Sequence, residues 1–139
     1  MVNIRYTREK TFTEADVQEL FLSVGWKSGL YPHRLFRALT HSSEVFTAWD
    51  GDKLVGLLRT LDDSCMTAYL HYALVHPHWQ GRGIASALLT MAKKHYADYL
   101  YINLTPEDKA NVPFYERHGF EVMANGAAMS LTHHIEDYK

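Results

Sequence analysis

The chain has 139 residues, the size of one ordinary domain with one core. Apolar residues make up 47% and charged residues 22%, a composition typical of soluble globular proteins that excludes a disordered chain. The formal net charge of -2 leaves no basic excess to neutralise the phosphates of a nucleic acid or of anionic lipids. We therefore expect a single domain over residues 1–139 that binds neither nucleic acid nor a membrane.

Cysteine usage and apolar stretches bear on the cellular compartment. The one cysteine, Cys65, cannot form an internal disulfide, which fits a reducing compartment. No apolar core of signal-peptide length stands near Met1, and the apolar stretches Leu54–Leu58 and Ile84–Leu89 are too short to span a bilayer. The expected location is therefore cytoplasmic.

Two helices are predicted first along the chain. The first carries its apolar stripe at helical spacing, with Val17, Leu20, Phe21 and Val24. Thr13 stands before this stripe as the N-cap, and Gly25 ends it. A second, short helix is expected from Pro32, with an apolar face made of Leu35, Phe36 and Leu39.

Three strand-like runs follow the helices. Glu44–Trp49 and Lys53–Leu61 are joined by Asp50-Gly51-Asp52, whose Asp-Gly pair is typical of a tight hairpin. The third run, Thr67–Val75, ends at His76-Pro77. These runs predict neighbouring strands of one sheet.

The second half of the chain alternates helices and strands. After a loop, a helix is expected with a buried stripe made of Ile84, Leu88, Met91, Ala92 and His95. Tyr99–Leu104 is expected as a buried strand, followed by a short helix near Val112–His118 and one or two strands between Phe120 and Leu131. This order predicts a mixed α/β domain with a parallel strand pair inside it.

The segment from Leu74 to Ser86 delivers a glycine-bearing loop from a strand onto a helix N-terminus. Unpaired backbone N–H groups and the helix dipole favour an anion there, and Gly81, Gly83 and Ala85 let phosphate oxygens approach the backbone. The pattern indicates a phosphate-bearing ligand, with a simple turn as the alternative. The chain lacks the P-loop pattern, and the loop lacks the third small position of the dinucleotide fingerprint. ATP and NAD are therefore disfavoured as ligands.

Two ordered segments, Gln80-x-x-Gly83-x-Ala85 and the run 114–120 (Phe-Tyr-Glu-Arg-His-Gly-Phe), are informative together. They resemble the acyl-CoA-binding motif Q/R-x-x-G-x-G/A and the F-Y-E-K/R-x-G-F element of the GNAT superfamily of N-acetyltransferases. The resemblance spans residues 44 to 131. It implies a central, mostly antiparallel sheet with one splayed parallel strand pair, flanked by about four helices.

The resemblance also implies a co-substrate, acetyl-CoA, between the two splayed strands. Its pyrophosphate is expected on backbone N–H groups of Gly81–Ser86 and its pantetheine arm beside the strand end. The residues that the resemblance assigns to acetyl-CoA are Leu74, Val75, Gln80, Gly81, Arg82, Gly83, Ile84, Ala85, Ser86, Asn111 and Phe114. Asn111 has an alternative role as the cap of the short helix.

No metal is expected. His76-x-His78 and His133-His134 bring histidines together, but no cysteine pair or spaced carboxylate completes a ligand set.

Acetyl transfer to an amine requires a proton for the departing thiolate and a donor for the carbonyl oxygen. The resemblance assigns the thiolate's proton to Tyr115, whose phenol, with a pKa of about 10, stays protonated at neutral pH. The alternative is that Tyr115 only packs in the core. A backbone N–H near Val75 is the expected donor to the carbonyl oxygen, if the strand bulges there.

His71 is the candidate general base. It stands four residues before Val75, so strand alternation places it on the same face as Val75 and Ala73, with Tyr69 on that face too. An imidazole pKa of about 6.5 suits proton removal at neutral pH. The strand also resembles the corresponding strand of GNAT members that acetylate arylalkylamines, where histidines assist deprotonation. A structural core histidine, or a reaction without a side-chain base, remains the alternative.

The acceptor is the least determined part. Asp62, Asp63 and Glu44 are candidates to attract a cationic amine, unless they are only solvated. Trp26, Tyr31 and Tyr69 are candidates to line an aromatic acceptor site, unless they are core residues.

We therefore expect an N-acetyltransferase that transfers acetyl from acetyl-CoA to the primary amine of a small molecule by direct attack on the thioester. The alternatives are transfer to a protein N-terminus or lysine, a non-catalytic acyl-CoA-binding or regulatory module, and a structural domain that binds nothing. A homodimer through an exposed edge strand is a further expectation.

Overall fold

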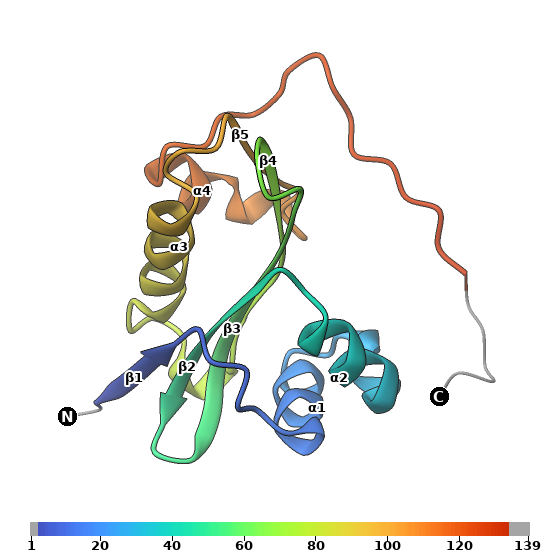
Figure 1. The fold of residues 1–139 in the computed structure, drawn as a ribbon, viewed down its shortest axis with the longest axis vertical. Helices are drawn as coiled ribbons and strands as arrows, with labels where there is room; N and C mark the ends of the chain where they lie inside the picture. The colour runs from blue at the N-terminus through green and yellow to red at the C-terminus, as the bar shows by residue number, and fades with distance from the viewer. Residues whose placement is uncertain (1–2, 134–139) are drawn as a thin grey trace.

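The centre of the structure is a five-stranded sheet with the strand order β1-β2-β3-β4-β5 (Figure 1). The computed structural model describes residues 3–133. The strands are β1 (Ile4–Thr7), β2 (Glu44–Asp50), β3 (Lys53–Asp62), β4 (Thr67–Val75) and β5 (Tyr101–Leu104). Strands β1 to β4 pair antiparallel, and β5 pairs parallel with β4. The predicted mixed α/β fold with one parallel strand pair is confirmed.

Helices cover both faces of this sheet (Figure 1). Within residues 3–133 the α-helices are α1 (Glu14–Ser23), α2 (Pro32–Thr40), α3 (Ile84–His95) and α4 (Val112–Arg117). The predicted N-cap of α1 is confirmed, because the Thr13 hydroxyl accepts the Asp16 N–H at 3.1 Å and the Asp16 carboxylate accepts the Thr13 N–H at 2.8 Å. No helix in this part of the chain is long and apolar enough to cross a membrane.

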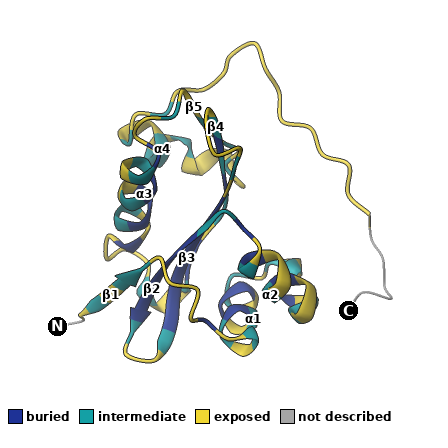
Figure 2. Ribbon diagram, viewed as in Figure 1, coloured by how far each residue is buried: buried dark blue, intermediate teal, exposed yellow. Residues whose placement is uncertain are grey.

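Two apolar clusters lie on opposite sides of the sheet. Figure 2 shows the buried residues on the strands and on the helices that pack against them. The side covered by α1 and α2, which includes Leu57 and Leu74, is called the α1 face. The side covered by α3, which includes Leu58 and Val75, is called the α3 face. On β3, a Cβ added at Gly56 would lie 2.8 Å from Ile84 Cγ2, so glycine allows α3 to approach the sheet closely.

Strand β4 contains a bulge at Tyr72. His71 pairs with Arg59 and Ala73 pairs with Leu58, so Tyr72 has no partner on β3, and its φ of 58° lies in the left-handed region. Arg59 also pairs with Val45, a residue of the cluster on the α1 face.

The bulge changes the face on which His71 lies. Because directly paired residues point to the same side of a sheet, His71 lies on the α1 face with Tyr72 and Leu74, whereas Ala73 and Val75 lie on the α3 face. The prediction that His71 shares a face with Val75 and Ala73 is therefore wrong, since one extra residue breaks the alternation.

Strand β5 is shorter and more exposed than predicted. It pairs with Thr67–Leu70 of β4 alone, and Tyr101 is 55% exposed at the edge of the sheet. The prediction of a buried strand over Tyr99–Leu104 is wrong because no described strand covers the outer edge of β5. Beyond Leu70, β4 continues without β5, which leaves the gap that splayed strands imply.

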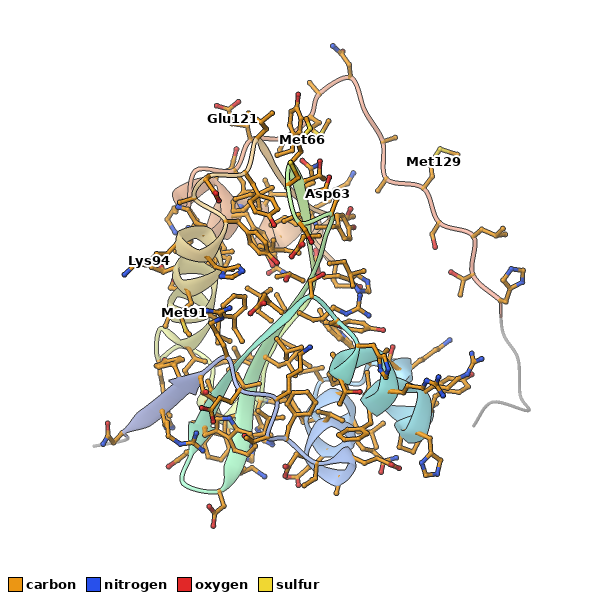
Figure 3. All side chains as sticks on the ribbon, in the orientation of Figure 1. Asp63, Met66, Met91, Lys94, Glu121 and Met129 are labelled. Atoms are coloured by element: carbon orange, nitrogen blue, oxygen red, sulfur yellow. The ribbon has the colours of Figure 1, made fainter. Side chains whose placement is uncertain are left out.

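The segment after α4 forms no strand within the described residues 120–133. It runs away from the body of the protein, and Met129 is 94% exposed (Figures 1 and 3). The predicted strands between Phe120 and Leu131 are therefore wrong in this structure. A strand needs a hydrogen-bonding partner, and the apolar side chains at Val122, Met123 and Leu131 have no packed surface here.

Candidate active site

The loop between β4 and α3 is tied to the sheet at two points. The Trp79 indole Nε1 donates to Asp50 Oδ2 at 3.0 Å, and the Gln80 amide Nε2 donates to the Val75 carbonyl at 3.0 Å. Gly81 and Gly83 both have φ of 78°, a conformation that glycine adopts without strain. The loop therefore reaches the N-terminus of α3 in a fixed path.

The N-terminus of α3 is open. The first intrahelical bond runs from the Ala87 N–H to the Gly83 carbonyl, so the N–H groups of Ile84, Ala85 and Ser86 have no acceptor within the helix. A Cβ added at Gly81 or Gly83 would meet no atom within 4 Å. These donors, together with the helix dipole, form a cradle that can hold an anion.

The residues of this cradle differ in which atoms they can offer to a ligand. The Ile84 side chain is 1% exposed in the core of the α3 face, so Ile84 can contribute only its backbone. The Arg82 side chain is exposed and can bring positive charge to the loop. The Ser86 hydroxyl lies 3.1 Å from His118 Nε2, so the group that Ser86 can offer to a ligand is its backbone N–H.

Helix α4 is held beside α3 through His118. The Lys93 ammonium donates to the His118 carbonyl at 2.6 Å, in addition to the contact between His118 and Ser86. Phe114 packs on the α3-face cluster, with its ring 5.0 Å from that of His118 and 5.1 Å from that of Tyr115. These contacts fix Tyr115 relative to the cradle.

A cavity of about 60 Å³ lies at the gap between β4 and the chain that follows β5. Residues of both faces form its wall: Leu58, Leu70 and Ala73 from the α3 face, and Trp26, His71 and Tyr72 from the α1 face. The rest of the wall consists of Leu104, Thr105, Glu107, Asn111 and Tyr115. Since one water molecule needs about 10–15 Å³ of such cavity space, the cavity has room for a reacting group and not for a whole cofactor.

Tyr115 reaches this cavity as a free phenol. Its hydroxyl has no hydrogen bond to any residue within the described range 3–133, although the side chain is half-buried. Burial raises the pKa of Tyr115, and the nearby Glu107 carboxylate raises it further. The phenol is therefore protonated at neutral pH and able to donate.

Asn111 also faces the cavity. Asn111 stands at the N-cap position of α4, as the alternative predicts, but its side chain makes no capping hydrogen bond to this helix. The cap one turn earlier is Asp108, whose carboxylate accepts the Ala110 N–H at 2.9 Å. The Asn111 amide is thus available to a ligand.

His71 lies on the cavity wall opposite the chain that carries Tyr115. Its ring centroid is 4.2 Å from that of Tyr72 and 6.0 Å from that of Tyr69, which confirms that Tyr69 shares its face. Burial lowers the pKa of His71, and the Arg59 guanidinium lowers it further. The imidazole is therefore neutral at neutral pH, the form that can accept a proton.

The bulge stands at Tyr72 and not at Val75. Val75 pairs regularly with Gly56, so the conditional expectation of a bulge near Val75 is wrong. At Tyr72 the backbone leaves the β3 ladder beside the cavity, and the Tyr72 hydroxyl lies 2.8 Å from Ser28 Oγ. The irregular backbone at Tyr72 therefore stands at the cavity wall.

The acidic candidates for the acceptor have structural roles elsewhere. The Asp62 carboxylate accepts from the Tyr96 hydroxyl at 2.6 Å, on the α3 face. The Asp63 carboxylate accepts the N–H groups of the turn before β4, from Cys65 to Thr67. The Glu44 carboxylate accepts from Arg8 Nε at 2.9 Å. None of these three side chains lines the cavity.

Comparison with known proteins bears on this site. Residues 41–122 match the model of the acetyltransferase (GNAT) domain family. A GNAT family acetyltransferase from Streptococcus pneumoniae is 30% identical, with 94% of this chain and 98% of that chain covered at a TM-score of 0.81. The chain belongs to the GNAT family of acetyltransferases.

Other GNAT-like solved structures share the fold at lower identity. A Staphylococcus aureus protein is 18% identical over 94% of this chain and 100% of its own, with a TM-score of 0.84. An acetyltransferase from Trypanosoma brucei is 15% identical over 93% of this chain and 100% of its own, with a TM-score of 0.69. No curated protein sequence matches the chain.

The GNAT fold brings the sequence-predicted residues together in two groups. His71, Asn111 and Tyr115 meet at the cavity, and the run from Gln80 to Ser86 forms the cradle. Leu74 and Val75 lie between these groups, with their side chains buried in opposite clusters, so only their backbone can contact a cofactor.

Sequence reasoning missed part of the cavity wall. Thr105 and Glu107 follow β5 in a polar loop without a motif, and no pattern marked them. Thr105 accepts from the Tyr69 hydroxyl at 2.9 Å, which joins β4 to this loop across the gap. Arg59 was also missed, although a charged residue inside an apolar strand was a visible signal.

Histidines do not gather into a metal site in the described part of the GNAT domain. Among residues 3–133 no three or more His, Cys, Asp or Glu side chains lie close enough to hold a metal ion. His134 of the His133-His134 pair lies outside the described residues.

Proposed function

We propose that this GNAT protein transfers the acetyl group of acetyl-CoA to the primary amine of a small molecule, by direct attack on the thioester. The observation that carries the proposal is the cavity at the β4–β5 gap. It joins the two faces of the sheet and holds a protonated phenol and a neutral imidazole on its wall. An acyl donor and an amine that enter from opposite faces can therefore meet there.

The α3 face suits acetyl-CoA. The N–H groups of Gly81–Ser86 hold the pyrophosphate, with the exposed Arg82 beside them and Gln80 fixing the loop. The backbone of β4 near Leu74 and Val75 has no β5 partner and accepts the pantetheine arm as an added strand.

Asn111 and Phe114 complete the proposed cofactor site from α4. The Asn111 amide has no capping bond and faces the cavity, so it can hydrogen-bond the end of the pantetheine arm. The Phe114 ring provides an apolar surface beside the cradle. The thioester then lies in the cavity beside the bulge.

The chemistry assigns one step to each group at the cavity. The bulge at Tyr72 presents a backbone N–H that stabilises the negative charge on the carbonyl oxygen as the amine nitrogen attacks. His71 takes the proton that the nitrogen releases. Tyr115 donates its proton to the departing thiolate, so the products are the N-acetylated amine and free CoA.

Acceptor size supports a small molecule. The cavity is small, at about 60 Å³, and the rings of Trp26 and Tyr72, with centroids 6.0 Å apart, form part of its wall on the α1 face. A protein N-terminus or a lysine side chain is the second acceptor class that the site can take. We further propose a cytoplasmic protein, in line with the exposed free Cys65, and a homodimer that uses the exposed edge of β5.

The test is release of free CoA from acetyl-CoA in the presence of a panel of amines, small peptides included. We expect release that requires both acetyl-CoA and an amine and that is fastest with a small amine. Binding of acetyl-CoA without release over the whole panel contradicts the proposal and favours a non-catalytic acyl-CoA-binding module. Fastest release with peptides favours the protein acceptor.

A further inference from the structure

Arg59 is the one buried charged residue within 3–133, with an exposed fraction of 8%. Its Nε is fully buried and has no hydrogen-bond partner. No carboxylate or carbonyl of the described chain pairs with the guanidinium. The contact that it makes is with the face of the Tyr72 ring, 4.7 Å from Cζ to the ring centroid.

An unpaired guanidinium at this position is costly. It carries five N–H donors and no acceptor, and it has lost much of its hydration without gaining a counter-ion. Burial lowers the pKa of Arg59, yet a guanidinium remains charged at neutral pH. Stacking on Tyr72 offsets part of the cost and leaves the in-plane N–H donors unused. The flanking Leu57 and Leu58 indicate that an apolar side chain would suit the strand better.

Arg59 lies next to the candidate active site on the α1 face. It is the direct cross-strand partner of His71, and its guanidinium stacks on Tyr72. Both of these neighbours form the cavity wall. Arg59 itself does not line the cavity, so its guanidinium lies directly behind the part of the wall that His71 and Tyr72 form.

The surroundings favour one kind of anion. A guanidinium binds carboxylate or phosphate oxygens through two parallel N–H donors. The cavity wall within the described residues holds no lysine or arginine, and its charged member is Glu107. The single positive charge of Arg59, with the Glu107 carboxylate nearby, suits a singly charged, planar anion better than a phosphate dianion. The favoured ligand group is therefore a carboxylate.

We propose that Arg59 binds a carboxylate of the acceptor, so that the acceptors of this enzyme are small amino carboxylates. The proposal rests on the proposed acetyl transfer and narrows its acceptor class. The bond changes are the same: nitrogen bonds to the acetyl carbon, the carbon–sulfur bond breaks, His71 takes the amine proton and Tyr115 protonates the sulfur. The carboxylate orients the amine and does not react.

The first test compares acceptors that differ only in the carboxylate. Glycine, β-alanine and γ-aminobutyrate are each assayed against the corresponding carboxamide with acetyl-CoA. We expect at least one carboxylate to exceed its amide in kcat/KM by about tenfold or more, mainly through KM, because charged hydrogen bonds are lost in the amide. In Arg59→Met the ratio of kcat/KM for the carboxylate to kcat/KM for its amide is expected to fall to near one. Arg59→Lys is expected to keep part of this preference.

A matched control uses an arginine outside the site. Arg37→Met replaces an exposed arginine of α2 with the same apolar residue and is expected to leave the ratio unchanged. Arg59→Met is expected to fold and to unfold at a temperature about 2–4 °C higher than the wild type, because an unpaired buried charge is removed. A lower unfolding temperature for Arg59→Met means that Arg59 supports the fold and overturns the proposal.

The second test does not depend on turnover. The N-acetylated forms of the same three amino carboxylates and of their amides are added in thermal unfolding measurements. A carboxylate that binds the native state raises the wild-type midpoint, while its amide and the variant Arg59→Met show no shift. If no amine is acetylated but this selective shift occurs, the proposed function fails and the carboxylate site stands. If amides and carboxylates react equally, or no selective shift occurs, the carboxylate site is overturned and acetyl transfer is judged by CoA release alone.

Discussion

The two faces of strand β4 differ in how far apart in the sequence the residues that form them lie. On the α3 face, Val75 leads through a short loop into α3, and the cradle consists of consecutive residues. On the α1 face, the neighbours of His71 and Tyr72 come from β3 and from the turn after α1. The Tyr72 hydroxyl forms a hydrogen bond with Ser28 of that turn. The first face follows from a continuous stretch of sequence, and the second depends on contacts between distant residues.

The bulge at Tyr72 connects these two faces. It places His71 and Tyr72 together on the α1 face while Ala73 returns to the α3 face, at the point where β4 has no β5 partner. Because of this one extra residue, the titratable side chain of His71 lies on one face at the gap, and the β4 backbone that we propose binds acetyl-CoA lies beside the other face. Substitutions on each face are expected to have separable effects.

The largest effect is expected from Tyr115→Phe. Removal of the hydroxyl takes away the proton donor that we propose for the thiolate, and general acid catalysis contributes about 10²–10⁴-fold to a rate. We expect kcat to fall by about a hundredfold, while the dissociation constant of acetyl-CoA changes little because the ring still packs against Phe114. Steady-state rates and direct titration of acetyl-CoA measure the two quantities. An unchanged kcat would remove Tyr115 from the mechanism.

The next effect concerns the α3 face. In Gly83→Ala the new Cβ enters the open cradle at a φ of 78°, so binding of acetyl-CoA is expected to weaken about tenfold, equivalent to about 1.4 kcal/mol. Gly25→Ala is the matched control, since Gly25 has a φ of 74° and equally open space at the end of α1. Both variants lose some stability, and only Gly83→Ala should lose affinity. Equal affinities in titration calorimetry would argue against the cradle.

A smaller effect is expected in the pH profile of the α1 face. Because burial and Arg59 lower the pKa of His71, kcat/KM should rise with pH through a pKa below the ordinary value and then stay level near neutral pH. The charged or titratable groups around His71 are Arg59, Tyr69, Tyr72, Glu107 and Tyr115.

Arg59→Met tests the assignment of that pKa. Loss of the cation removes one of the two causes of the lowered pKa, so the inflection should move to higher pH by less than about one unit. His71→Ala should abolish the inflection. A profile that is identical in the wild type, Arg59→Met and His71→Ala would assign His71 to a structural role.

The smallest effect is expected in the segment that belongs to neither face. Met129 lies far from both clusters (Figure 3), so Met129→Ser should change the free energy of unfolding by less than about 0.5 kcal/mol. Leu88→Ala in the core of the α3 face should cost about 2–5 kcal/mol in the same denaturant titration. A large loss in Met129→Ser would mean that this segment packs on a surface in solution.

Sequence patterns predicted the parts of the molecule that rest on local interactions. The Thr13 cap, the strands from Glu44 to Val75 and the helix from Ile84 follow from capping chemistry, turn chemistry and apolar periodicity. The cradle followed from glycines at a strand-to-helix junction. Each of these features is decided within a few residues.

The features that the sequence could not predict depend on packing between residues that are far apart in the chain. A bulge leaves no residue-type signal in Tyr69–Val75, so the face of His71 was predicted wrongly. The residues 120–131 have strand-like composition, but a strand exists only where another strand pairs with it. A role for Arg59 can be inferred only from the structure, in which it lies beside His71 without a counter-ion.

The most direct test of the account is thermal unfolding of the protein with acetyl-CoA, with ATP and NAD as controls. We expect that acetyl-CoA raises the unfolding midpoint of the wild type, that ATP and NAD raise it much less, and that Gly83→Ala responds more weakly than Gly25→Ala. A folded wild-type protein whose midpoint does not change with acetyl-CoA would contradict the cofactor site on the α3 face and the acetyl transfer built on it.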